Sequence, residues 1–116
     1  MGPITLKQEI NIILKASGYK YFYGSGSVET FPYIRYTLGD NYSTRLSNKK
    51  GLKNIWYQID VFSDVPIDVE AEETMLSKIE SELEQNGLIT TNWLEVISEN
   101  NTTRYPNYHY FLEVRK

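Results

Sequence analysis

The strongest structural signal in the sequence is the alternation of side chains over residues 53–63. Alternation with a period of two is the pattern of a β-strand that buries one of its faces. We expect the face formed by Ile55, Tyr57, Ile59 and Val61 to lie in the core. The opposite face is mixed, and Trp56 and Phe62 on it suggest that another element covers it in part.

A second aromatic strand is expected at residues 31–38, ahead of a connection far longer than a hairpin requires. Roughly fourteen residues separate Leu38 from Lys53, whereas a tight hairpin takes about two to five. Long connections in compact domains are usually functional or disordered. We therefore expect a long flexible hairpin arm at about residues 39–52. Its charged side chains include Arg45, Lys49 and Lys50.

Two helices are expected where apolar residues recur at three- and four-residue spacing. The first covers about residues 4–16 and stops at Gly18, and its apolar face is formed by Ile4, Leu6, Ile10, Ile13 and Leu14. The second covers residues 67–86, with Asp68 as its N-cap and Gly87 as a left-handed stop. Its apolar face is formed by Val69, Leu76, Ile79 and Leu83, with Met75 widening the stripe. Glu70, Glu72 and Glu73 are expected in its first turn, where the helix dipole favours carboxylates.

Shorter strands are expected at residues 19–23, 93–98 and 108–114. The order is then helix, three strands, helix, two strands. Two amphipathic helices on one face of a mostly antiparallel sheet bury both stripes and one sheet face, which predicts an α+β fold. A chain of 116 residues is one domain, covering residues 1–116, because it is too short for two cores.

Composition excludes several classes of protein. The chain has no cysteine, which excludes disulfides and thiolate metal sites and agrees with a reducing compartment. No stretch approaches the ~18 apolar residues of a membrane span, and the first residues contain no apolar run of the length that a secretion signal requires, so we expect no such signal. We therefore expect no membrane partner.

The sequence offers no catalytic constellation. His109 is the only histidine, and no second titratable group is evident near it, so a structural or exposed role is expected. Asp60, Asp64 and Asp68 are spaced by four residues, but this spacing straddles a strand end and a helix start, and they do not share a face by periodicity. Metal binding there is the minor alternative. We expect no metal, no other cofactor and no enzymatic activity.

Charge is distributed unevenly along the chain. Residues 64–84 carry a net charge of −7, whereas residues 35–53 carry +4. One interpretation is that both are simply solvated surfaces. The other is that they are complementary surfaces on neighbouring copies, which form a heterologous contact that can close into a ring. The candidate interface residues are Tyr42, Arg45, Lys49 and Lys50 on the arm, and Glu70, Glu73 and Glu80 on the acidic helix.

Nucleic acid is the rival partner for the arm. Tyr42 with Arg45, Lys49 and Lys50 could combine base stacking with phosphate contacts. Because the chain is acidic overall, with a net charge of −3, we do not expect nucleic acid as a specific partner. A small binding module for nucleic acid, or for a peptide added at a sheet edge, remains the alternative function.

Two strand motifs and their context carry a resemblance to a known family. Residues 32–36 read Pro-Tyr-Ile-Arg-Tyr, and residues 57–63 read Tyr-Gln-Ile-Asp-Val-Phe-Ser after a long polar loop and before a long acidic helix. In this order, after an N-terminal helix, they resemble the tail-completion, or tail-terminator, proteins of long-tailed bacteriophages and prophages. The resemblance spans most of the chain and is best over residues 31–83.

The resemblance implies a non-enzymatic virion assembly protein. Members of that family are small α+β subunits of a ring, expected to be a hexamer, that stops growth of the tail tube and docks to the head. The implied partners are further copies of the chain, the phage tail-tube protein and the head connector protein. The implied location is the head–tail junction of the virion, reached from the cytoplasm of the bacterial host.

Overall fold

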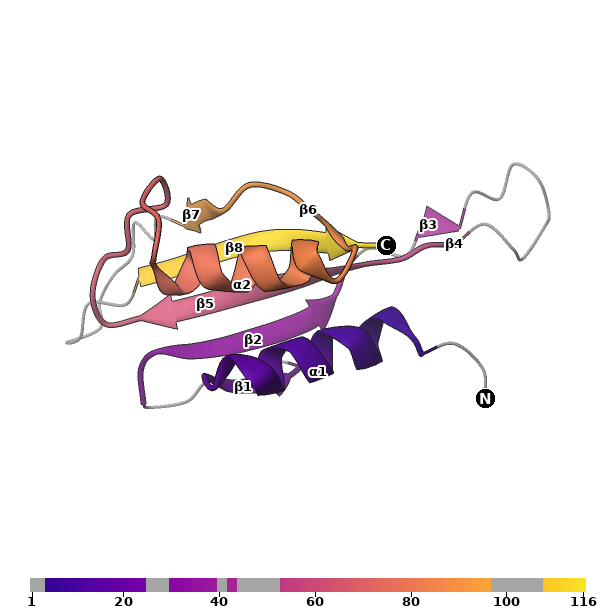
Figure 1. Cartoon of the computed structure of the whole chain (residues 1–116), viewed down its shortest axis with the longest axis horizontal. Coiled ribbons are helices and arrows are strands. Elements are labelled where there is room, and N and C mark those ends of the chain that lie inside the picture. The colour runs from indigo at the N-terminus through magenta and orange to yellow at the C-terminus, as the bar shows by residue number, and fades with distance from the viewer. Residues whose placement is uncertain (1–3, 25–29, 40–41, 44–52, 97–107) are drawn as a thin grey trace.

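The computed structural model describes residues 4–24, 30–39, 42–43, 53–96 and 108–116. Figure 1 shows its elements along the chain. In order they are α1 (Leu6–Ser17), β1 (Lys20–Tyr23), β2 (Tyr33–Leu38), β3 (Tyr42–Ser43), β4 (Lys53–Asn54), β5 (Trp56–Ser63), α2 (Met75–Gln85), β6 (Ile89–Thr90), β7 (Leu94–Val96) and β8 (Tyr108–Arg115).

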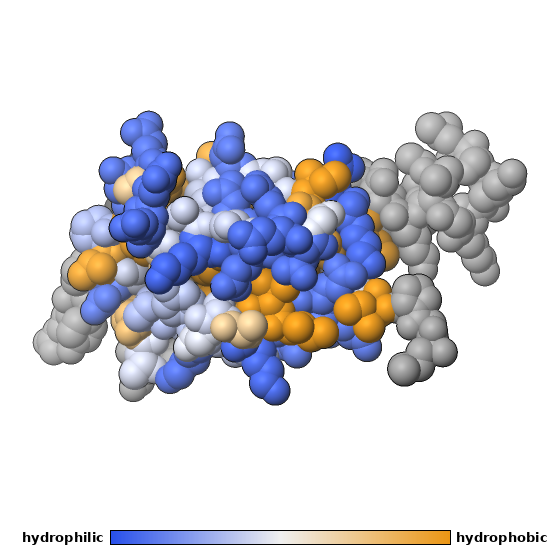
Figure 2. Space-filling model, in the orientation of Figure 1, coloured by the Kyte–Doolittle hydropathy of each residue, from blue (hydrophilic) through white to orange (hydrophobic). Residues whose placement is uncertain are grey.

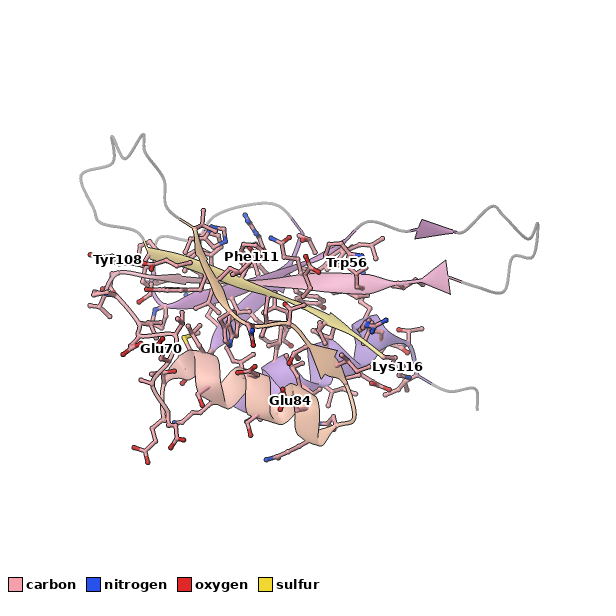
Figure 3. All side chains as sticks on the ribbon, turned by 90° about the horizontal axis from the view of Figure 1, so that it is seen from above. Trp56, Glu70, Glu84, Tyr108, Phe111 and Lys116 are labelled. Atoms are coloured by element: carbon pink, nitrogen blue, oxygen red, sulfur yellow. The ribbon has the colours of Figure 1, made fainter. Side chains whose placement is uncertain are left out.

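The main sheet is mostly antiparallel, with β5 at its centre. The strand order is β1-β2-β5-β8-β6, and β7 also pairs with β8. The β1–β2 pair is parallel, and every other described pair is antiparallel. Both helices lie on one face of this sheet (Figures 1 and 3). The expected α+β fold, with two helices on one face, is confirmed.

The core lies between the helices and the face of β5 that the sequence predicts to be buried. Ile59 and Val61 are fully buried, Tyr57 is nearly so, and Ile55 packs against the cluster from its edge. The helices contribute Ile10, Ile13, Leu14, Leu76, Ile79 and Leu83. Burial of each large apolar side chain contributes about 1.5–3 kcal/mol before chain entropy is subtracted.

Helix α1 begins with a reciprocal cap that the sequence reading missed. The Thr5 hydroxyl accepts a hydrogen bond from the Gln8 backbone N–H, and the Gln8 side chain accepts one from the Thr5 backbone N–H. This capping box fixes the first turn. Ile4 therefore precedes the helix and is exposed, not part of its buried stripe. The expected stop at Gly18 is confirmed by its φ of 84°.

Helix α2 begins later than predicted. Thr74, not Asp68, is its N-cap, because the Thr74 hydroxyl accepts a hydrogen bond from the Ser77 N–H and Glu73 has a φ of 64°, which no continuous helix permits. Asp68 instead accepts a hydrogen bond from the Glu70 N–H in a separate turn. The expected helix dipole interaction of Glu70, Glu72 and Glu73 is therefore wrong. Gly87 does end the helix region with a φ of 82°.

Past the end of β2 and before the start of β5, the chain extends beyond the main sheet. Beyond the hydrogen bond from the Gly39 N–H to the Trp56 carbonyl, the chain forms the two-stranded pair β3–β4, in which Tyr42 lies opposite Asn54. We call this pair the stem. It projects from one end of the sheet in Figure 1. Residues 40–41 and 44–52 of the expected arm lie outside the described residues.

Neither of the two described helices has the length or the apolar run that a membrane-spanning helix requires.

Candidate interaction surfaces

An acidic surface lies directly after the last residue of β5. Residues 64–73, which we call the acidic segment, contain five carboxylates and no lysine or arginine: Asp64, Asp68, Glu70, Glu72 and Glu73. All five side chains are exposed. Val65 and Val69 between them are also exposed, at 57% and 43%. The segment therefore presents alternating carboxylates and apolar side chains to solvent.

The acidic segment is fixed to the sheet by hydrogen bonds at its base. The Ile67 N–H donates to the Tyr110 hydroxyl at 2.7 Å, and the Val65 N–H donates to the Ser63 hydroxyl at 3.1 Å. Burial raises the pKa of the Tyr110 hydroxyl above its usual value, although the hydrogen bond from the Ile67 N–H acts in the opposite direction. These contacts hold the segment in a defined position at one end of β8.

Two of the predicted acidic interface residues lie together and one does not. Glu70 and Glu73 both belong to the acidic segment, whereas Glu80 lies in the second turn of α2 and is half-buried. Burial, and to a lesser degree the neighbouring Glu84 carboxylate, raises the pKa of Glu80. Glu84 in turn accepts a hydrogen bond from the Thr90 hydroxyl. Glu80 is therefore packed into the helix surface and is not part of the same projecting surface.

A groove with basic walls lies at the opposite end of β5. We call it the basic groove; it has a volume of about 590 Å³ and lies between the start of α1, the start of β5 and the end of β8. Its basic lining residues are Lys7, Arg115 and Lys116, and the rest of its lining is Ile4, Thr5, Leu6, Ile55 and Tyr57. Sequence reasoning missed this groove, because nothing in the pattern brings Lys7 next to the C-terminal strand.

The cations of the groove differ in how they are engaged. Lys116 pairs with Glu9 through a contact of 2.8 Å between Nζ and Oε1. Lys7 lies over the Tyr23 ring, with Nζ 3.7 Å from the ring centroid. Arg115 is exposed at the end of β8. Glu70 and Lys116 are labelled toward opposite ends of the main sheet in Figure 3.

Of the residues predicted for the arm side of the interface, the structure describes only Tyr42. Tyr42 is in β3, and Arg45, Lys49 and Lys50 lie outside the described residues. The base of the stem is packed tightly, since a Cβ at Gly39 would overlap the Trp56 ring. The stem continues β2 and β5 at the end of the sheet where the basic groove lies.

The face of the sheet away from the helices holds a buried charge. Asp60 is 1% exposed and accepts hydrogen bonds from His109 Nε2 at 2.7 Å and Gln58 Nε2 at 2.9 Å. Its second oxygen lies 3.8 Å from Arg35 Nε. The expectation that His109 has no titratable neighbour is therefore wrong. Strand pairing brings the two together across 49 residues of sequence, which no local pattern reports.

Aromatic rings form a ladder across the same face. Phe62 stacks on His109 with centroids 4.2 Å apart and on Tyr33 at 4.8 Å, and Tyr33 stacks on Phe22 at 5.8 Å. Trp56 and Phe111 lie on this face too, as Figure 3 shows. The ladder accounts for the mixed face of β5 that the sequence indicated. It also fixes the His109 ring from one side while Asp60 holds its Nε2.

Within the described residues, no group of three or more histidine, aspartate or glutamate side chains is arranged to hold a metal ion. Asp60 is buried in the sheet, whereas Asp64 and Asp68 are exposed beyond its end. Their spacing of four residues thus does not bring them to one face.

A comparison with known protein families finds no match, and a comparison with curated proteins finds none. The fold and the two charged surfaces are therefore described from the structure of the chain itself. What they define is a small α+β domain with oppositely charged surfaces at the two ends of its central strand.

Proposed function

We propose that this chain is a structural subunit of a homo-oligomeric ring, with six copies, at the head–tail junction of a long-tailed phage or prophage. The ring caps the tail tube and joins it to the head connector protein. In this proposal the chain has no enzymatic activity, and it assembles in the cytoplasm of the bacterial host.

One observation carries the proposal, namely that the two charged surfaces occupy opposite ends of β5. The basic groove and the stem lie at its start, and the acidic segment follows its last residue. Surfaces that differ in this way form head-to-tail contacts between copies, and such contacts generate rings when the rotation closes. The resemblance of residues 31–83 to tail-terminator proteins is the reason for placing such a ring at the head–tail junction of a virion.

The test uses the tail-tube protein from the same phage or prophage. Tube polymerisation with and without the chain is followed by negative-stain imaging. We expect a ring at one end of each tube and shorter tubes as more chain is added. Tubes of unchanged length with no added density would contradict the proposal.

A charge reversal on the arm sharpens this test. The variant Lys49→Glu/Lys50→Glu should fold as the wild type does and should cap tubes less well, because these lysines are proposed to contact the next copy. A matched control is Lys15→Glu/Lys78→Glu, which makes the same charge change at exposed positions of α1 and α2. If both variants lose capping equally, the arm has no specific role.

A second candidate function is suggested by the face away from the helices. Trp56, Phe111 and Phe22 are partly exposed there, and such rings can stack on the bases of single-stranded nucleic acid. Glu113 on the same face opposes phosphate binding. This function would be supported by a mobility shift with single-stranded DNA at low salt that is abolished by Phe111→Ala. The absence of any shift would exclude nucleic-acid binding by this face.

A further inference from the structure

The basic groove has an unusual lining for a surface that faces water. Ile4 on its wall is 47% exposed, and Figure 2 shows apolar surface on this face of the molecule below the hydrophilic covering of α2. Lys7 and Arg115 stand beside it, both exposed. An apolar surface next to positively charged side chains favours a partner that supplies both carboxylates and apolar side chains.

The chain itself carries a segment of this chemistry. The acidic segment alternates carboxylates with Val65 and Val69, and all of these side chains are exposed. It has no cation of its own. Its charge is opposite to that of the groove, and its exposed valines match the exposed isoleucine.

A chain cannot seat its own acidic segment in its own groove. The two surfaces are joined by β5, whose eight residues span about 26 Å as a strand at about 3.3 Å per residue. β5 is paired on both sides, with β2 and with β8, so it cannot bend to bring its ends together. The occupant must come from another molecule.

We propose that the basic groove of one copy binds the acidic segment of a second copy, with Lys7 and Arg115 facing Glu70 and Glu72, and with Ile4 against Val65 and Val69. This contact rests on the proposed function, since it supplies the interface of the ring. It uses described residues only and does not involve the arm.

The experiment mixes two variants that each lack one half of the contact. Lys7→Glu/Arg115→Glu reverses the groove and leaves Lys116 paired with Glu9. Glu70→Lys/Glu72→Lys reverses the acidic segment. Association is measured by analytical ultracentrifugation at low salt, with circular dichroism to establish that each variant is folded. The control is Lys15→Glu/Lys78→Glu, which lies outside both surfaces.

Each reversed variant alone should associate at least about tenfold more weakly than the wild type, because like charges then oppose each other at the contact. The equimolar mixture should associate again, into complexes of about 27 kDa and larger, twice the chain mass of 13.5 kDa or more, because the reversed groove and the reversed segment are also opposite in charge. Each partner still has the intact half that the other lacks. The control should associate as the wild type does, and 0.5 M salt, which shortens the screening length to roughly 4 Å, should weaken the wild-type contact.

Two other outcomes overturn the proposal in different ways. If the wild type associates and the reversed variants associate equally well, or if their mixture stays monomeric, the groove is not the docking site and the ring function survives. If the wild type stays monomeric at every concentration, both the contact and the ring function are contradicted.

Discussion

His109 Nε2 donates a hydrogen bond to the Asp60 carboxylate at 2.7 Å, across the pairing of β5 with β8. Asp60 is 1% exposed, so its charge depends on donors from the protein. A buried carboxylate that loses a donor is destabilising, because water cannot replace it. This contact therefore ties the last strand of the chain to the centre of the sheet.

His109→Ala should lower the free energy of unfolding by about 1.5–3 kcal/mol, the usual range for a hydrogen bond to a charged group. His109→Phe retains a ring against Phe62 but provides no donor, so it should recover only the stacking part of the loss. A double-mutant cycle with Asp60→Asn, followed by urea unfolding, should give a coupling above about 0.5 kcal/mol. Simple additivity would show that the contact adds no stability.

Ile59→Ala should lower the free energy of unfolding by about 2–5 kcal/mol, because it opens a cavity at a fully buried position in the central strand. Ile12→Ala is the matched control. Ile12 is 57% exposed on α1, so its replacement should change stability by less than about 0.5 kcal/mol. Urea midpoints of the two variants compare them directly, and equal effects would place the core elsewhere.

Thr74→Ala should destabilise the chain by about 0.5–2 kcal/mol, because the Thr74 hydroxyl caps the first turn of α2. Asp68→Ala should cost less, since Asp68 supports a solvent-exposed turn ahead of the helix. Thermal unfolding of both variants tests where the helix begins. A larger loss for Asp68→Ala would favour the earlier start that the sequence predicts.

Glu80→Gln should change the pH dependence of stability. Burial raises the pKa of Glu80 above its ordinary value of 4.5, and the Glu84 carboxylate adds to this. The folded chain thus holds the Glu80 proton more tightly than the unfolded chain does. The contribution of this residue to the free energy of unfolding therefore falls as pH rises from about 4.5 through the raised pKa.

The variant has no proton to lose at this position, so its stability relative to the wild type should rise over that pH interval and then level off. Urea midpoints from about pH 4 to pH 7 measure the difference. Glu72→Gln, at an exposed position outside the helix, serves as the control. If the difference in stability between Glu80→Gln and the wild type stays constant with pH, the raised pKa of Glu80 does not contribute to stability as expected.

Local pattern was enough to predict most of the fold. The alternation around Ile59 placed the core face of β5, and helical spacing around Ile10 and Ile79 placed both helices. Local pattern failed where two signals of similar strength compete. Asp68 and Thr74 are both good caps, and the left-handed backbone of Glu73, which decides between them, has no sequence signature of its own.

The candidate sites were less accessible to sequence reasoning because they depend on contacts between distant residues. The acidic segment is continuous in sequence, so Glu70 and Glu73 lie in one segment whatever the fold, and their role at an interface stays a prediction. The basic groove unites Lys7 with Arg115, and the buried charge unites Asp60 with His109; both need the strand order β5-β8. The arm residues Arg45, Lys49 and Lys50 remain a prediction.

The molar mass of the purified wild-type chain, measured by light scattering across a rising concentration series at low salt, tests the central claim most directly. Head-to-tail contacts that close into a six-membered ring predict a plateau at about 81 kDa, six times the chain mass of 13.5 kDa. A chain that stays at the monomer mass throughout, or that stops at a dimer, would contradict the account.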